Sequence, residues 1–186
     1  APGKGEYAVV DSQGREVPHQ RSGDDIRFAA EVPSMGYSLY RLMDSRPRST
    51  KSEIRVGKKK LENRFFKITL DANGVITSII EKNTGREVVP VGQRANLLQL
   101  FEDKPTDWPA WDIDFHYEDK WEDITSVECI EVVENGPVRG AIEITRSFGK
   151  SRIRQTIAIY ADVPRIDFLT WVDWHESWKC LKASFP

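Results

Sequence analysis

A dense mixture of carboxylates and aromatic rings lies between residues 102 and 123. This stretch holds nine carboxylates and two lysines, together with five large aromatic side chains: Trp108, Trp111, Phe115, Tyr117 and Trp121. A pyranose stacks its apolar face on an aromatic ring while its hydroxyls donate to carboxylates, so the composition suits a sugar ligand. A loop that folds its tryptophans onto the core, or onto another domain, has the same composition.

Asp112 and Asp114 are two residues apart within this stretch. If the backbone there is extended, both carboxylates point to the same side, and a retaining glycosidase holds two carboxyl groups about 5–5.5 Å apart. A solvated or substrate-binding pair of acids is the commoner origin of this pattern. A calcium site built from these oxygens is a further alternative, although the spacing matches no regular calcium loop.

Other reactive groups are sparse. No two of the three histidines stand at metal-ligand spacing, and there is no phosphate loop, nucleophile elbow or C-x-x-C motif. We expect His175, which follows an apolar strand, to pair with a neighbouring carboxylate; a ligand role is the alternative. Cys129 lies in an apolar run and is interpreted as core filler, and one bridge to Cys180 stays open.

The charge balance and the apolar content bear on partners and location. The 186 residues carry a formal net charge of −2, which gives no reason to expect nucleic acid. The basic run 58–60 is expected to be a solvated strand edge. No stretch approaches the roughly 20 apolar residues of a membrane span, and the first residues lack the apolar core of a signal peptide. We therefore expect a cytoplasmic protein with reduced thiols and no membrane partner.

Short apolar alternations broken by turn residues indicate an antiparallel β-sandwich. The Asn73-Gly74 step supplies the positive φ that a tight hairpin between residues 66–70 and 75–80 needs. Further strands are expected at residues 26–32, 37–42, 95–101, 127–133, 138–148, 151–160 and 166–174. Since no segment has a long amphipathic helical pattern, the predicted fold class is all-β.

A polar stretch without periodicity divides the chain. It predicts a linker at residues 46–52, between a small β segment at 1–45 and a main β-sandwich domain at 53–186.

Several motifs resemble those of a known family. Residues 61–66 (LENRFF), 71–74 (DANG) and 81–88 (EKNTGREV) resemble the opening of the C-terminal β domain of glycoside hydrolase family 38 α-mannosidases. The most specific stretch, 95–105 (ANLLQLFEDKP) with 108–114 (WPAWDID), is similar to the bacterial and cytosolic branch of that family. Residues 173–176 (DWHE) and 181–186 (LKASFP) resemble a later signature of the same domain.

The resemblance implies a retaining exo-α-mannosidase. In this family the zinc ligands, the nucleophilic aspartate and the acid/base residue lie in an N-terminal α/β barrel, so no catalytic residue, metal site or cofactor site is expected in this chain. The implied fold is part of a galactose-mutarotase-like supersandwich whose first half helps wall the substrate pocket. Trp108, Trp111, Asp112 and Asp114 are then the substrate-binding candidates, with Asp112 accepting a mannose hydroxyl and Trp111 stacking.

Three functions remain to be separated: a non-catalytic part of an α-mannosidase, a stand-alone mannose-binding module, and a domain that docks on another domain through its tryptophans. The expected partners are mannose-containing glycans and the N-terminal barrel. The chain begins without Met and ends where the family's domain continues, so we expect a fragment. Unpaired strand edges in such a fragment favour self-association.

Overall fold

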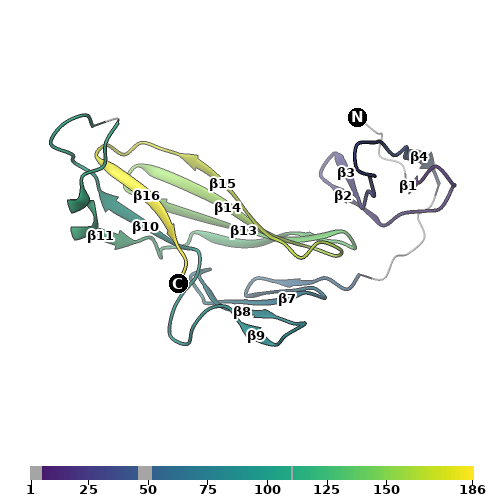
Figure 1. Ribbon diagram of the computed structural model, residues 1–186, viewed down its shortest axis with the longest axis horizontal. Helices are drawn as coiled ribbons and strands as arrows, with labels where there is room; N and C mark the ends of the chain where they lie inside the picture. The colour runs from purple at the N-terminus through teal and green to yellow at the C-terminus, as the bar shows by residue number, and fades with distance from the viewer. Residues whose placement is uncertain (1–5, 46–51, 110) are drawn as a thin grey trace.

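The computed structural model describes residues 6–45, 52–109 and 111–186, and these residues form an all-β protein (Figure 1). Every strand pairing is antiparallel, which confirms the predicted fold class. The elements are β1 Tyr7–Val10, β2 His19–Ser22, β3 Asp25–Phe28, β4 Arg41–Asp44, β5 Arg55–Gly57, β6 Lys60–Glu62, β7 Phe66–Leu70, β8 Ile76–Glu81, β9 Arg86–Glu87, β10 Leu97–Glu102, the short 3-10 helix η1 Phe115–Asp119, β11 Trp121–Asp123, β12 Cys129–Asn135, β13 Arg139–Phe148, β14 Ser151–Tyr160, β15 Ile166–Asp173 and β16 Lys179–Ser184.

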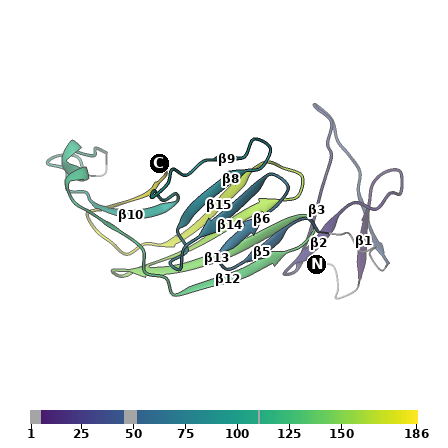
Figure 2. The same ribbon diagram turned by 90° about the horizontal axis from the view of Figure 1, so that it is seen from below.

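The core of the protein lies between two sheets. A five-stranded meander, β5 to β9, faces a four-stranded sheet of β12 to β15 (Figure 2). Alternate residues of these strands point inward, and Ile68, Ile76, Ile142, Ile144 and Ile157 are all buried in one cluster. The expected hairpin is present, since Gly74 at φ 69° ends the turn between β7 and β8.

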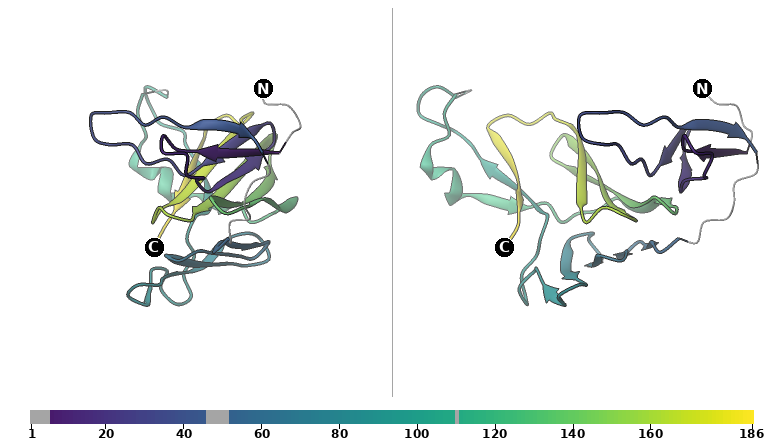
Figure 3. Two further views of the ribbon diagram at one scale, coloured as in Figure 1. Left: turned by 90° about the vertical axis from the view of Figure 1, so that its right-hand side faces the viewer. Right: turned by 45° about the vertical axis from the view of Figure 1, so that its right-hand side comes forward.

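A third sheet closes one end of the molecule. Its order is β11-β10-β16, so the last strand of the chain pairs with β10, and β10 also pairs with β11 beyond the loop (Figure 3). Leu98, Leu100, Ile124 and Ile153 form a second, smaller core beneath this sheet. The sheet therefore fixes both ends of the aromatic and acidic stretch on one rigid base.

The N-terminal β segment is tied to the sandwich by side chains of β2 and β3, with the amide of Gln20 making the most hydrogen bonds. Gln20 of β2 accepts hydrogen bonds from the backbone N–H groups of Val138 (2.9 Å) and Arg139 (2.8 Å). It donates to the Glu134 carboxylate (3.1 Å) and to the Arg139 carbonyl (3.0 Å). The N-terminal segment therefore contacts the sandwich at the turn between β12 and β13. The predicted linker falls mainly on residues 46–51, which lie outside the described residues, and the predicted domain boundaries stay predictions.

Two predicted strands of the N-terminal segment are shorter than expected. β3 ends at Phe28 instead of continuing to residue 32, and the strand expected at 37–42 begins only at Arg41. The Glu31 carbonyl accepts hydrogen bonds from the hydroxyls of Ser38 (2.6 Å) and Tyr40 (3.0 Å). Side-chain hydroxyls thus form the hydrogen bonds to this backbone carbonyl that a paired strand would otherwise form.

The interpretation of Cys129 as core filler is wrong. Cys129 is exposed on β12, an edge strand of the four-stranded sheet, and both cysteines are free thiols. Successive side chains of a strand point to opposite faces, and Ile130 packs against the core, so its neighbour Cys129 lies on the outer face. The basic run 58–60 behaves as predicted, because it is exposed at the turn between β5 and β6.

Candidate functional site

The loop between β10 and β11 is closed at its neck by one carboxylate. Glu102 binds the ammonium group of Lys104 through one oxygen (2.9 Å) and that of Lys120 through the other (2.8 Å). The Glu102 backbone N–H also donates to the Lys120 carbonyl (2.9 Å). The hydrogen bond from Lys120, followed by that from Lys104, lowers the pKa of Glu102 to about 2. We call this arrangement the Glu102 clasp.

The clasp gives the loop a defined pH dependence. Because the folded-state pKa of Glu102 lies below its ordinary value, the clasp is complete above about pH 4.5 and is lost as the pH falls toward about 2. We expect pepsin to cleave the 103–119 segment increasingly fast as the pH falls through this window. Glu102→Gln removes the charge, so this variant is expected to be cleaved fast already at pH 4.

The matched control is Glu122→Gln, which changes an exposed acid of β11 at the same neck. It should keep the cleavage profile of the parent chain. Equal cleavage of Glu102→Gln and the parent chain at pH 4 would show that the clasp does not hold the loop.

A single lysine of β16 holds the far part of the loop. The Lys182 ammonium lies 4.5 Å from the ring centroid of Tyr117 in η1 and 5.1 Å from that of Phe101 in β10. It also donates to the Tyr117 hydroxyl, and this hydrogen bond raises the pKa of Lys182. The cation–π contacts therefore fix η1 against the β10–β16 pair.

The candidate residues lie on a tight turn at the outer part of this loop. The Trp108 carbonyl accepts hydrogen bonds from the backbone N–H groups of Trp111 (2.8 Å) and Asp112 (3.0 Å). Trp108 has a φ of 55°, in the left-handed region that a bulky residue rarely adopts. The indole of Trp111 is 91% exposed and that of Trp108 is 74% exposed. The loop thus presents two aromatic faces to solvent.

Asp112 and Asp114 have different partners. Asp114 accepts from the backbone N–H (2.9 Å) and the hydroxyl (3.2 Å) of Thr106, across the loop. Asp112 accepts from the N–H of its own neighbour, Ile113 (2.9 Å). Asp114 therefore stabilises the loop's shape through one oxygen, and the second carboxylate oxygen of each aspartate has no hydrogen-bond partner among the described residues.

Aromatic exposure extends beyond the loop. All six tryptophans are more than a third exposed, namely Trp108, Trp111, Trp121, Trp171, Trp174 and Trp178. Tryptophan is highly buried on average, so this is unusual. Sequence reasoning singled out the three in the loop and missed Trp178 in the β15–β16 connection. Only the pairing of β10 with β16, which sequence spacing does not reveal, brings that residue near the loop.

The DWHE motif, residues 173–176, stabilises a neighbouring turn. The Glu176 carboxylate accepts from the backbone N–H of Lys150 (2.6 Å) and the hydroxyl of Ser151 (3.0 Å), which join β13 to β14. The His175 imidazole lies 3.0 Å from the Asp173 carboxylate, as the sequence predicted. The motif therefore acts structurally at the end of β15.

Within residues 6–45, 52–109 and 111–186, no three His, Cys, Asp or Glu side chains are grouped so as to hold a metal ion. These residues therefore do not fit a zinc site. The zinc that the resemblance assigns to another domain stays a prediction. In the same ranges, no helix is long and apolar enough to cross a membrane.

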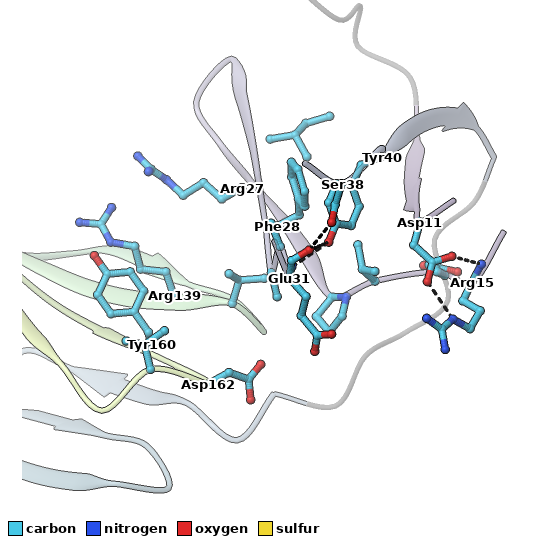
Figure 4. A pocket seen from close by; sticks show the side chains of 18 of the residues that line it. Asp11, Arg15, Arg27, Phe28, Glu31, Ser38, Tyr40, Arg139, Tyr160 and Asp162 are labelled. Atoms are coloured by element: carbon cyan, nitrogen blue, oxygen red, sulfur yellow. Dashed lines mark hydrogen bonds and ion pairs between the residues drawn. The ribbon is translucent and has the colours of Figure 1, made fainter. Parts of the chain in front are cut away.

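A separate groove of about 1250 Å³ lies between the N-terminal segment and the sandwich (Figure 4). Several of its polar side chains are engaged in ion pairs. Arg139 pairs with Glu134 (2.7 Å) and Asp11 pairs with Arg15 (2.8 Å). The Phe28 ring packs on that of Tyr40, with centroids 4.9 Å apart. The groove therefore lies where the N-terminal segment meets the sandwich, and none of the four substrate-binding candidates lines it.

Comparison with known proteins identifies the family. Alpha-mannosidase 2C1 of Mus musculus is 32% identical over 164 residues, which are 83% of this chain and 16% of that protein. Alpha-mannosidase G of Dictyostelium discoideum is 34% identical over 128 residues, 66% of this chain and 12% of that protein. The chain thus spans less than one fifth of the length of these relatives.

The crystal structure of an alpha-mannosidase from Enterococcus faecalis V583 has a similar fold, with a TM-score of 0.67 at 14% identity. The alignment covers 98% of this chain and 26% of that one. The model of the glycosyl hydrolases family 38 C-terminal domain matches residues 61–186, most of the chain. The chain therefore belongs to glycoside hydrolase family 38 and carries sequence of that family's C-terminal domain.

Proposed function

We propose that this chain is a non-catalytic β domain of a retaining exo-α-mannosidase, in which the β10–β11 loop walls the mannose pocket. The observation that supports it most is the pair of exposed side chains at the tip of a fixed loop. Trp111 offers a solvent-facing ring and Asp112 an available carboxylate oxygen. In a protein whose relatives are named alpha-mannosidases, these groups match the apolar face and the hydroxyls of a pyranose.

The charge of the loop favours a sugar over a protein partner. Residues 102–123 hold nine acids and two lysines, whereas the rest of the chain holds 20 acids and 25 bases. Both lysines are bound by Glu102. Asp and Glu are depleted from the centres of protein interfaces because their desolvation must be offset by cations. A neutral ligand rich in hydroxyl donors needs no such cations.

Each candidate residue then has its own role. Trp111 stacks on the sugar, and Asp112 accepts from a hydroxyl. The backbone carbonyl of Trp108 shapes the turn by accepting two hydrogen bonds. Its exposed indole supplies a second aromatic ring to the loop. Asp114 holds the loop through Thr106. Zinc, the nucleophile and the acid/base residue are assigned to the barrel domain of the intact enzyme.

The alternative is a stand-alone carbohydrate-binding module, and mannose titration of the isolated chain separates the two. A wall that is only one side of a pocket should bind weakly, so we expect no saturable change in tryptophan emission at millimolar mannose. A saturable change that disappears in Trp111→Ala and persists in Trp171→Ala would favour the module, because Trp171 lies on the four-stranded sheet against Arg154.

The remaining assignments follow from the same proposal. The partners are mannose-containing glycans and the barrel domain, and free thiols at Cys129 and Cys180 fit a cytoplasmic location. β12 and β15 end the four-stranded sheet of the described chain, so self-association through these edges stays a prediction that size-exclusion chromatography tests.

A further inference from the structure

The connection between β15 and β16 meets the loop at its neck. The backbone N–H of Asp103, the first residue after β10, donates to the carbonyl of Trp178 (2.9 Å). The register of β10 and β16 places Glu102 opposite Lys179, the residue after Trp178. In Figures 1 and 3 the start of β16 lies beside the loop. The β11-β10-β16 sheet therefore anchors both the connection that carries Trp178 and the loop that carries Trp108 and Trp111.

Trp178 is held in an unfavourable backbone conformation with its ring in solvent. Its φ is 58° and its side chain is 52% exposed. Met35, Asn96 and Trp108 are the other non-glycine residues with positive φ in the described part of the chain. Two exposed indoles on adjoining connections thus share a rare conformation, and such strained residues cluster at ligand clamps.

The junction also contains an unmet acceptor. One carboxylate oxygen of Asp103 is buried without a hydrogen-bond partner among the described residues. Buried polar atoms are nearly always paired, so this oxygen needs a donor from outside the described residues.

We propose that Trp178 is a second stacking position, which takes the sugar linked to the terminal mannose on the leaving-group side of the scissile bond. The inference rests on the proposed function of the loop. Trp111 and Asp112 already supply a ring and an acceptor for the terminal unit, and Trp178 comes from a different connection. A glycoside with two sugars has a second pyranose face for that ring.

Two substrates of the intact enzyme separate this position from the terminal one. α-Mannobiose places a sugar on the leaving-group side, whereas α-mannosyl fluoride releases only fluoride and leaves that side empty. We expect Trp178→Ala to lower kcat/KM for mannobiose by roughly 3- to 10-fold and to change that for the fluoride less than twofold. Trp178→Phe should retain most activity on mannobiose, because it keeps an aromatic face.

Trp171→Ala is the matched control, since that indole is similarly exposed (49%) but lies on the sheet against Arg154. It should affect neither substrate. Equal losses on both substrates, or no loss on either, with Trp178→Ala would overturn the assignment. Trp111→Ala tests the proposed function separately, because it should lower kcat/KM for mannosyl fluoride as well as for mannobiose. A Trp111→Ala variant with unchanged kcat/KM contradicts the proposed role of the loop, independently of the result for Trp178→Ala.

Discussion

In the intact enzyme, Asp112→Asn is expected to lower kcat/KM for α-mannosides by roughly 10- to 150-fold, as for a hydrogen bond to a charged acceptor. Asp112 lies at the tip of a loop fixed by the Glu102 clasp and by Lys182, so its free carboxylate oxygen has a defined position. Asparagine keeps the size of the side chain and removes its charge. Steady-state kinetics with an aryl α-mannoside measure the effect.

Asp107→Asn is the control for the overall charge of the loop, because Asp107 is an exposed acid of the same segment. It should change kcat/KM less than twofold. Trp111→Ala should also lower kcat/KM, since the stacking face is lost. Similar kinetics for the Asp107 and Asp112 variants would mean that the loop acts only through its net charge or lies away from the sugar.

Gly140→Ala is expected to destabilise the protein by about 1–3 kcal/mol through overpacking. A Cβ at Gly140 would lie 2.4 Å from the Cγ2 atom of Ile54 and 2.5 Å from that of Val56. Both neighbours are β-branched and stiff at χ1, so neither can move aside cheaply. Thermal unfolding should show a Tm lowered by roughly 2–10 °C.

Gly57→Ala provides the comparison, because Gly57 is also in a strand but a Cβ there would meet nothing within 4 Å. Its Tm should be unchanged or slightly raised. A Gly140 variant as stable as the Gly57 variant would show that the sheets separate there more easily than their packing indicates.

The main sandwich was predictable because its signals are local. Residues 138–148 and 151–160 are strand-like runs separated by the Gly149-Lys150 turn, and the structure has β13 and β14 at 139–148 and 151–160. The N-terminal segment was less predictable. There the hydroxyls of Ser38 and Tyr40 bind the Glu31 carbonyl in place of a neighbouring strand, and a polarity pattern does not predict such contacts. Cys129 shows the same limit: an apolar run does not tell which of its residues face the core.

The candidate site also has features that the sequence predicts and features that it does not. Composition and motif located the loop and its tryptophans, because both are properties of a contiguous stretch. The Glu102 clasp, the Lys182 contact with Tyr117 and the bond between Asp103 and Trp178 depend on pairing β10 with strands far along the chain. Such non-local pairing is set by tertiary packing, so the residue that extends the site could not be found from spacing alone.

The central claim is that this chain shapes a mannose pocket while its chemistry resides in another domain. The most direct test is the hydrolysis of 4-nitrophenyl α-mannoside by the isolated 186-residue chain, compared with its Asp112→Asn variant. The account predicts no release of nitrophenol above the buffer rate by either protein. Hydrolysis by the chain that is abolished in the variant would contradict it and place the catalytic carboxylate in the β10–β11 loop.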